Sequence, residues 1–184
     1  MKPLIILFFL MLSLVGFSQD KTKLRILTSV GIMGGESEAR PVYQLGAGLA
    51  FGRYYLGAGF GQDRYKFKSL PLFGDFRIDL GVKRLLFTYI NAGYNFSEKI
   101  SEEFTWQQTS FSQSGGAYFD GGLGYRIVLG KKNKLLLSAG YSRKDFSLTR
   151  TFKTICTTGN CPDAVFQYKY NLGRISTKIS WELW

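Results

Sequence analysis

The sequence contains no histidine, the side chain that most often carries protons in enzymes near neutral pH. Enzymes that cleave lipids or peptides commonly use a histidine to activate serine or water. Asp75 and Asp79 share one face of a predicted strand, but a strand separates residues at this spacing by about 13 Å. That exceeds the roughly 5 to 9.5 Å between glycosidase carboxylates. A Ser176 and Lys178 pair would arise by chance on any such strand. We therefore predict a protein that is not an enzyme and has no cofactor or metal.

Cysteine is also scarce, with Cys156 and Cys161 as the only two. They enclose Thr-Thr-Gly-Asn, and a Gly-Asn pair suits the tight turn that a short disulfide loop requires. The alternative is a redox or metal pair, but the Cys-x-x-Cys spacing and any histidine are missing. In an oxidising compartment we expect a disulfide between these two residues.

Long apolar runs are nearly absent as well. The run from Leu4 to Val15 is shorter than the ~20 residues of a spanning helix, and it follows Lys2. Small residues stand one and three positions before Gln19, as at a signal peptidase site. We predict that residues 1–18 are a secretory signal peptide and that residues 19–184 form one exported outer-membrane domain.

Acidic residues are outnumbered, with 13 Asp and Glu against 24 Lys and Arg, so the formal net charge is +11. Such a positive charge could indicate a protein that binds nucleic acid. An exported protein rarely meets nucleic acid, however, and these basic residues are dispersed along the chain. Anionic lipid headgroups are the partner that we expect instead.

What the chain does have is sustained alternation of apolar and small or polar residues, which is typical of strands with one apolar face. Eight segments show it: residues 24–32, 43–51, 54–61, 75–80, 88–96, 117–127, 135–142 and 174–183. Three short connections lie at residues 52–53, 81–84 and 129–134, and four long ones at 33–41, 62–71, 97–116 and 143–166. Short turns that alternate with long loops are typical of outer-membrane barrels. We predict an all-β fold, an eight-stranded antiparallel up-and-down transmembrane β-barrel with periplasmic turns and termini.

A soluble, exported lipocalin-like barrel that binds a small hydrophobic ligand would have a similar length and strand number. The aromatic residues favour the membrane, because they stand at both ends of the apolar faces and aliphatic residues stand between them. The predicted outer girdle comprises Tyr43, Phe60, Tyr94, Phe96, Phe119 and Tyr141, and the periplasmic girdle comprises Phe51, Tyr54, Tyr125 and Trp181. The opposite faces are rich in Gly, Ser and Asn and have few lone charges, unlike the Lys- and Glu-rich exterior that a soluble barrel needs.

Those opposite faces should line the lumen, where charges must be paired because an eight-stranded barrel is filled by side chains. The predicted lumen charge network comprises Arg25, Asp75, Arg77, Asp79, Asp120, Arg126, Arg174, Lys178 and Glu182. We expect a salt-bridge plug in which Asp79 pairs with Arg25, Arg77, Arg126 or Lys178. The glycines Gly46, Gly48, Gly57, Gly59 and Gly61 should make room for large side chains. An ion path is the alternative, but Tyr55, Tyr89, Tyr118 and Leu136 should interrupt it.

The two longest predicted loops carry the exposed aromatic and charged residues expected of a partner surface. These are Phe104, Trp106, Phe111, Arg150 and Phe152. The partner would be a surface or secretion-machinery protein, or lipopolysaccharide. The alternative is that the strands project beyond the membrane and these aromatic side chains pack on one another.

The segment Pro71-Leu72-Phe73-Gly74-Asp75-Phe76-Arg77 resembles the Pro-Leu-Phe-x-Asp-x-Arg segment of outer-membrane β-barrel proteins of the Bacteroidota, and Gln19 after the signal peptide is similar too. The resemblance implies a small barrel of the OmpA/OmpX kind, a family with no catalytic consensus. It implies a protein of the cell outer membrane, which we expect to be a monomer.

Overall fold

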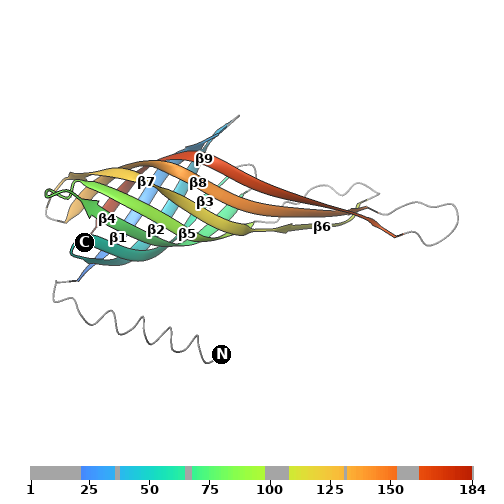
Figure 1. Cartoon of the computed structure of the whole chain (residues 1–184), viewed down its shortest axis with the longest axis horizontal. Coiled ribbons are helices and arrows are strands. Elements are labelled where there is room, and N and C mark those ends of the chain that lie inside the picture. Colours follow the sequence, from blue (N-terminus) through green and yellow to red (C-terminus); the bar gives the residue numbers. More distant parts are fainter. Residues whose placement is uncertain are drawn as a thin grey trace, which may run out of the picture.

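The chain folds as antiparallel β-structure (Figure 1). The structure, a computed structural model, describes residues 22–35, 38–64, 68–97, 108–130, 132–152 and 162–183. The predicted signal peptide lies outside these residues and stays a prediction. Within them no helix is long and apolar enough to cross a membrane. The strands are β1 (Lys23–Gly34), β2 (Ala39–Phe51), β3 (Tyr54–Asp63), β4 (Ser69–Leu80), β5 (Leu86–Ser97), β6 (Gln108–Ser114), β7 (Gly116–Val128), β8 (Asn133–Phe152) and β9 (Ala164–Leu183).

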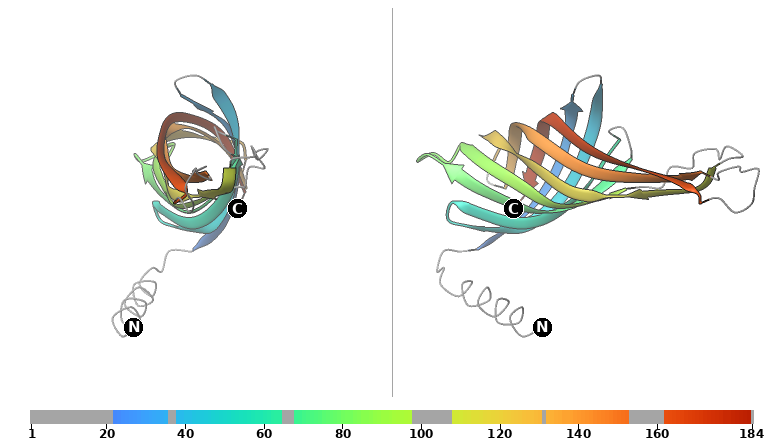
Figure 2. Two further views of the ribbon diagram at one scale, coloured as in Figure 1. Left: turned by 90° about the vertical axis from the view of Figure 1, so that its right-hand side faces the viewer. Right: turned by 45° about the vertical axis from the view of Figure 1, so that its right-hand side comes forward.

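Eight of these strands close into a barrel, which Figure 2 shows end-on at the left. Each pairs antiparallel with its neighbours in the order β1-β2-β3-β4-β5-β7-β8-β9. The ring closes between β9 and β1, from Ile26 opposite Leu183 to Gly34 opposite Ile175. The predicted eight-stranded antiparallel up-and-down barrel is confirmed. The ninth strand, β6, pairs with β8 beyond the end of the ring.

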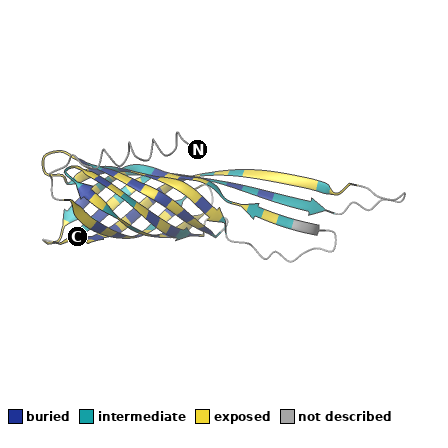
Figure 3. Cartoon of the chain, turned by 90° about the horizontal axis from the view of Figure 1, so that it is seen from below, coloured by how far each residue is buried: buried dark blue, intermediate teal, exposed yellow. Residues whose placement is uncertain are grey.

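Burial alternates residue by residue around the barrel, which gives the chequered pattern in Figure 3. In β4 the side chains of Asp75, Arg77 and Asp79 are buried, while Phe76 between them is exposed. The same alternation of buried and exposed side chains continues around the ring, because paired residues in neighbouring strands point to the same side of the sheet. The barrel is therefore polar inside and apolar outside.

Glycines make this polar interior possible. A Cβ atom at Gly57 would lie 2.5 Å from the Tyr55 hydroxyl oxygen, and one at Gly124 would lie 2.2 Å from Cζ of Phe87. The rings of Tyr55 and Phe87 thus lie directly over backbone that carries no side chain. Leu27, Ala50, Tyr55, Phe87, Tyr89 and Leu136 form one buried apolar cluster inside the barrel.

Several strands are longer than the alternation predicted, and those predictions of loop structure were wrong. Strand β4 begins at Ser69 rather than near residue 75, and β1 and β2 leave only residues 35–38 between them. The predicted loop at residues 97–116 contains β6, and most of the predicted loop at residues 143–166 belongs to β8 and β9. Cross-strand hydrogen bonds keep these segments extended where the outward face is no longer apolar.

The long ends of β8 and β9 project from the barrel together with β6 (Figures 1 and 2). We call this part the extension: β6, residues 145–152 of β8 and residues 164–172 of β9. Between the pairs Ser114–Ser147 and Tyr118–Lys144 the register shifts by one residue, as in a β-bulge at Gly115 and Gly116.

Candidate functional site: the barrel interior and the extension

All nine charged residues predicted for the lumen are at most 9% exposed, so the structure places each of them inside the barrel. They come from β1, β4, β7 and β9. Sequence reasoning missed Asp63 and Lys144, which are also buried, and Lys134, whose side chain is 14% exposed. Asp63 and Lys144 fall in segments predicted as loops. Their positions nevertheless continue the alternation of the neighbouring strands, and that signal could have identified them.

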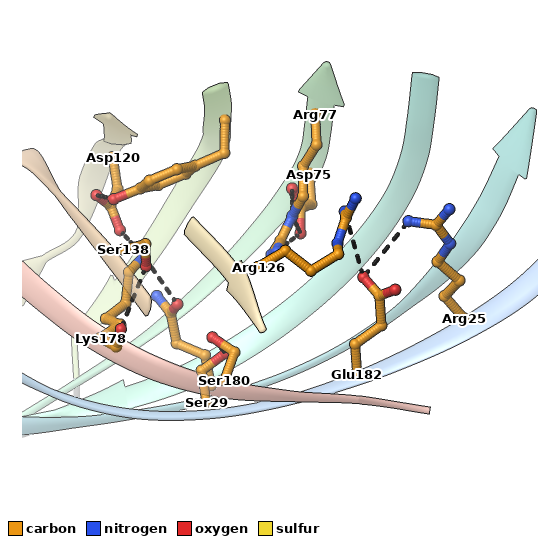
Figure 4. A network of polar contacts seen from close by, with 12 residues as sticks. Arg25, Ser29, Asp75, Arg77, Asp120, Arg126, Ser138, Lys178, Ser180 and Glu182 are labelled. Carbon is orange, nitrogen blue, oxygen red and sulfur yellow. Dashed lines mark hydrogen bonds and ion pairs between the residues drawn. The ribbon is translucent and has the colours of Figure 1, made fainter. Parts of the chain in front are cut away.

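Asp120 is the centre of the middle cluster (Figure 4). Its carboxylate pairs with the Lys178 ammonium and accepts a hydrogen bond of 3.0 Å from the Ser176 hydroxyl. The hydroxyls of Tyr89 and Tyr118 donate to it at 3.2 and 3.3 Å. Because Asp120 is fully buried, these donors replace the water that would otherwise solvate its charge.

Gln44 extends the same cluster across the lumen. Its side-chain nitrogen donates to the Tyr118 hydroxyl at 2.9 Å, and its side-chain oxygen accepts from Lys178 at 3.3 Å. The Lys178 ammonium also lies 4.6 Å from the ring centroid of Tyr89, within cation–π range. Strands β2, β5, β7 and β9 thus meet through one network of polar side chains.

A second cluster lies toward the short turns. Glu182 is 3.4 Å from Arg25 and 3.7 Å from Arg126 (Figure 4), and it is also 3.4 Å from Lys134. Arg126 is also 2.8 Å from Asp79, so Arg126 is the basic partner of that carboxylate. Beside them Arg77 holds Asp75 through two nitrogens, at 2.9 Å and 2.7 Å. The planar guanidinium favours this bidentate geometry.

The remaining buried charges lie toward the opposite end of the barrel. The Lys144 ammonium pairs with Asp63 and is 3.4 Å from the Ser69 hydroxyl. Arg174 lies apart from the two clusters already described, with its guanidinium carbon 3.2 Å from the position that a Cβ of Gly35 would take. Tyr55, Tyr89, Tyr118 and Leu136 are all at most 2% exposed, so their side chains fill the lumen around the charged clusters.

The extension contains three of the five residues predicted as a loop surface, but it places them on strands. Phe111 of β6 lies opposite Arg150 of β8, which lies opposite Phe166 of β9. The Arg150 guanidinium is 5.8 Å from the Phe111 ring, and the rings of Phe152 and Phe166 are 5.8 Å apart. Phe104, Trp106 and the predicted disulfide of Cys156 and Cys161 lie outside the described residues.

The two faces of the extension differ in chemistry. One face carries Phe111 and Gln113 of β6, Phe146, Leu148 and Arg150 of β8, and Phe166, Tyr168 and Tyr170 of β9. The other carries Val165 and the polar residues Ser112, Ser114, Asp145, Ser147, Thr149, Thr151, Gln167, Lys169 and Asn171. In the barrel, by contrast, the apolar residues of β8 and β9 other than Leu136 point outward. The apolar face of these two strands therefore changes sides where the barrel ends.

Comparison with known proteins adds little to this geometry. No family model matches the chain, and no curated protein matches it. The chain is similar to the de novo designed protein TMB2.3, solved by solution NMR, at 11% identity and a TM-score of 0.45, with 90% of this chain and 95% of that chain covered. It is also similar to the translocator domain of the autotransporter NalP from Neisseria meningitidis, at 14% identity and a TM-score of 0.27, with 92% and 91% covered.

At these identities and TM-scores neither similarity is evidence for the fold or the function of this chain. The barrel is instead defined by the strand pairings of the chain itself. The resemblance to the Bacteroidota family stays a prediction. Among the described residues no group of three or more His, Cys, Asp or Glu could hold a metal ion.

Proposed function

We propose that this chain is a non-enzymatic barrel of the outer membrane, exported by its signal peptide, which binds a surface protein or lipopolysaccharide through the extension. The observation that carries the proposal is the change of the apolar face along β8 and β9. Leu137, Ile179 and Trp181 are exposed on the outside of the barrel. Beyond the barrel the outward positions become Ser147, Thr149 and Lys169. Lipid surrounds the first region and water the second.

The apolar exterior supports the membrane location. Side chains such as Leu45, Leu56 and Leu123 are between 45% and 64% exposed, whereas soluble monomers rarely expose a continuous apolar surface of this kind. From Tyr43 to Phe51 the outward face of β2 covers about 27 Å along the strand, or about 21 Å along the axis at a tilt of ~40°. That height is close to the about 25 Å apolar band of outer-membrane barrels.

A soluble lipocalin-like carrier is not favoured. Its apolar face would line a ligand cavity, but here the interior holds Asp120, Lys178, Arg126 and their partners, paired with one another. The closed ring also leaves the barrel with no open sheet edge. A lipid environment requires this closure, because lipid cannot hydrogen-bond to unpaired backbone groups.

The extension supports the binding role, because it has an open strand edge and the closed barrel has none. The pairing of β9 with β1 ends at Ile175, while its pairing with β8 continues to Ala164. Within the described chain, the outer half of β9 is therefore an edge strand. Phe166 and Tyr168 of this strand are 48% and 46% exposed. An open edge with aromatic side chains favours an extended polypeptide, which can add to it as a further strand.

Photo-crosslinking in living cells tests the proposal. A photoreactive phenylalanine in place of Phe166 or Tyr168 should give a discrete adduct with a surface protein or with lipopolysaccharide, and the type of adduct identifies the partner. The same residue in place of Tyr43, which is 53% exposed on the barrel wall, is the matched control and should give lipid adducts. Protein adducts from position 43 and none from positions 166 and 168 would contradict the proposal.

A further inference from the structure

An open groove lies on the outer wall of the barrel at the point where β1 and β9 separate. The last pair of these two strands is Gly34 with Ile175. Strand β1 ends there, whereas β9 continues into the extension, and Figure 2 shows β9 and the β1–β2 pair leaving the ring in different directions. The groove has a volume of about 690 Å³. Its outward-facing residues are Ile32, Gly34, Tyr141, Gly173, Ile175 and Thr177, and Gly35 and Arg174 complete its lining.

Two glycines on the outward face create the groove. A Cβ atom at Gly34 would meet no heavy atom of a residue beyond its chain neighbours within 4 Å, so the space above it is open. A Cβ atom at Gly173 would lie 2.1 Å from the hydroxyl oxygen of Tyr141, so this tyrosine side chain lies across Gly173. Glycine within a strand often marks a place where a ligand approaches the backbone closely. The floor of the groove is therefore bare backbone.

The sides of the groove are apolar side chains that belong to the outer wall. Ile32 is 58% exposed, Ile175 is 68% exposed and Tyr141 is 52% exposed. Arg174, the charged residue of the lining, is buried and interacts with another group of its own chain. The lining thus offers apolar contact rather than an exposed charge. Tyr141 belongs to the predicted outer girdle, so the groove lies at the depth where acyl chains meet headgroups.

An acyl chain fits this groove better than a polypeptide does. The groove lies on the face of the sheet, whereas backbone N–H and C=O groups point along the sheet toward neighbouring strands. Ile32 is paired with Thr177 in this way, and Gly34 with Ile175. A polypeptide in the groove would therefore leave its own backbone groups without partners, which is costly away from water. An acyl chain has no polar group to satisfy, and each methylene group that it buries is stabilising.

We infer that this groove binds one acyl chain of a membrane phospholipid, which lies against the bare backbone of Gly34 and Gly173. The inference rests on the proposed membrane location, and it adds a specific lipid site to the barrel wall. Elsewhere on the wall a lipid meets only protruding side chains. In the groove the chain is enclosed between Ile32, Ile175 and Tyr141, so it buries more of its surface and stays bound longer.

The test counts the phospholipids that stay bound when the mature protein is transferred from phosphatidylethanolamine vesicles into mild detergent, and native mass spectrometry gives the count. Gly34→Ala and Gly34→Ile fill the groove in two steps, and the open space above Gly34 lets a side chain begin there without a clash. Gly74→Ile is the matched control, because Gly74 is also exposed on the wall and a Cβ there would be 3.8 Å from the Ala92 carbonyl oxygen. Retarded migration on gels without heating checks that each variant is folded.

The wild-type protein and the Gly74→Ile control should each retain one phospholipid. Gly34→Ile should lower the occupancy about tenfold, because isoleucine displaces about two methylene groups of the acyl chain, and Gly34→Ala should lie between. Equal retention by the wild type and Gly34→Ile, or an equal loss in the control, would overturn the inference. So would a groove that holds detergent only, or a dimer mass that Gly34→Ile abolishes. Wild-type protein that fails to insert into vesicles at all would instead overturn the proposed membrane location, and this inference with it.

Discussion

At the scale of single residues, the interior is a set of mutually dependent charges. Asp120 lies among Lys178, Ser176 and two tyrosine hydroxyls, and none of these groups reaches bulk solvent. Burying a charge is costly, and the attraction of its partner offsets that cost only while both are present. Removing one member therefore leaves a charge that neither water nor protein stabilises.

Asp120→Ala should lower the free energy of unfolding by about 3 to 5 kcal/mol, because it leaves the Lys178 ammonium uncompensated. Adding Lys178→Met should recover part of that loss. Urea unfolding in lipid vesicles measures both variants. Asp145→Ala is the control: its pair with Arg143 is about half exposed, so it should cost at most about 1 kcal/mol. Strictly additive effects of the two lumen substitutions would show that this pair is not coupled.

At the scale of one element, each barrel strand separates two environments. In β2, Gln44 is 7% exposed and bonded to Tyr118 and Lys178 inside the barrel. Ala47 of the same strand is exposed, and it pairs with Ile26 of β1 and Ala58 of β3 in the middle of the apolar wall. Substitutions on the two faces of this strand should therefore have different consequences.

Ala47→Arg should cost roughly 2 to 4 kcal/mol, the range found for a basic residue at the middle of the bilayer. Gln44→Glu should cost less, because the new carboxylate lies beside the Lys178 ammonium. Ala47→Leu, which keeps the outer face apolar, is the control and should be nearly neutral. The unfolding free energies of all three variants are measured in phosphatidylcholine vesicles. Equal costs for Ala47→Arg and Gln44→Glu would reverse the assignment of the two faces.

At the scale of the whole molecule, stability should reside in the closed ring rather than in the extension. The ring contains eight contiguous pairings, from β1 with β2 around to β9 with β1. In the extension, β8 pairs only with β6 and β9, and none of the other ring strands takes part. The proposed binding role and the stability of the fold would thus belong to different parts of one chain.

Deleting residues 148–168 and joining Ser147 to Lys169 by an Asn-Gly turn should leave the barrel folded, because these two residues lie opposite each other. The unfolding free energy should fall by less than it does for Asp120→Ala. Gel migration without heating and urea unfolding provide the measurement. The deletion also removes the predicted Cys156–Cys161 disulfide, which should add little global stability because its loop is short. A chain that no longer folds after this deletion would contradict the assignment.

By itself the sequence determined the number of strands in the ring, the antiparallel order and the side of each ring strand that meets the interior. The short turns specify the antiparallel order, and alternation with a period of two specifies the other two, because a shift of one residue would place charges such as Asp75 and Arg77 on the apolar outer face. The nine predicted lumen charges followed from that periodicity.

Only the tertiary structure decided which charges pair, since partners such as Arg126 and Asp79 lie on different strands and meet through the curvature of the ring. It also decided how far β8 and β9 continue. Their outer halves lose the outward apolar face, so the sequence pattern there predicts a loop rather than a strand. The hydrogen bonds to neighbouring strands, which the pattern does not record, keep them extended.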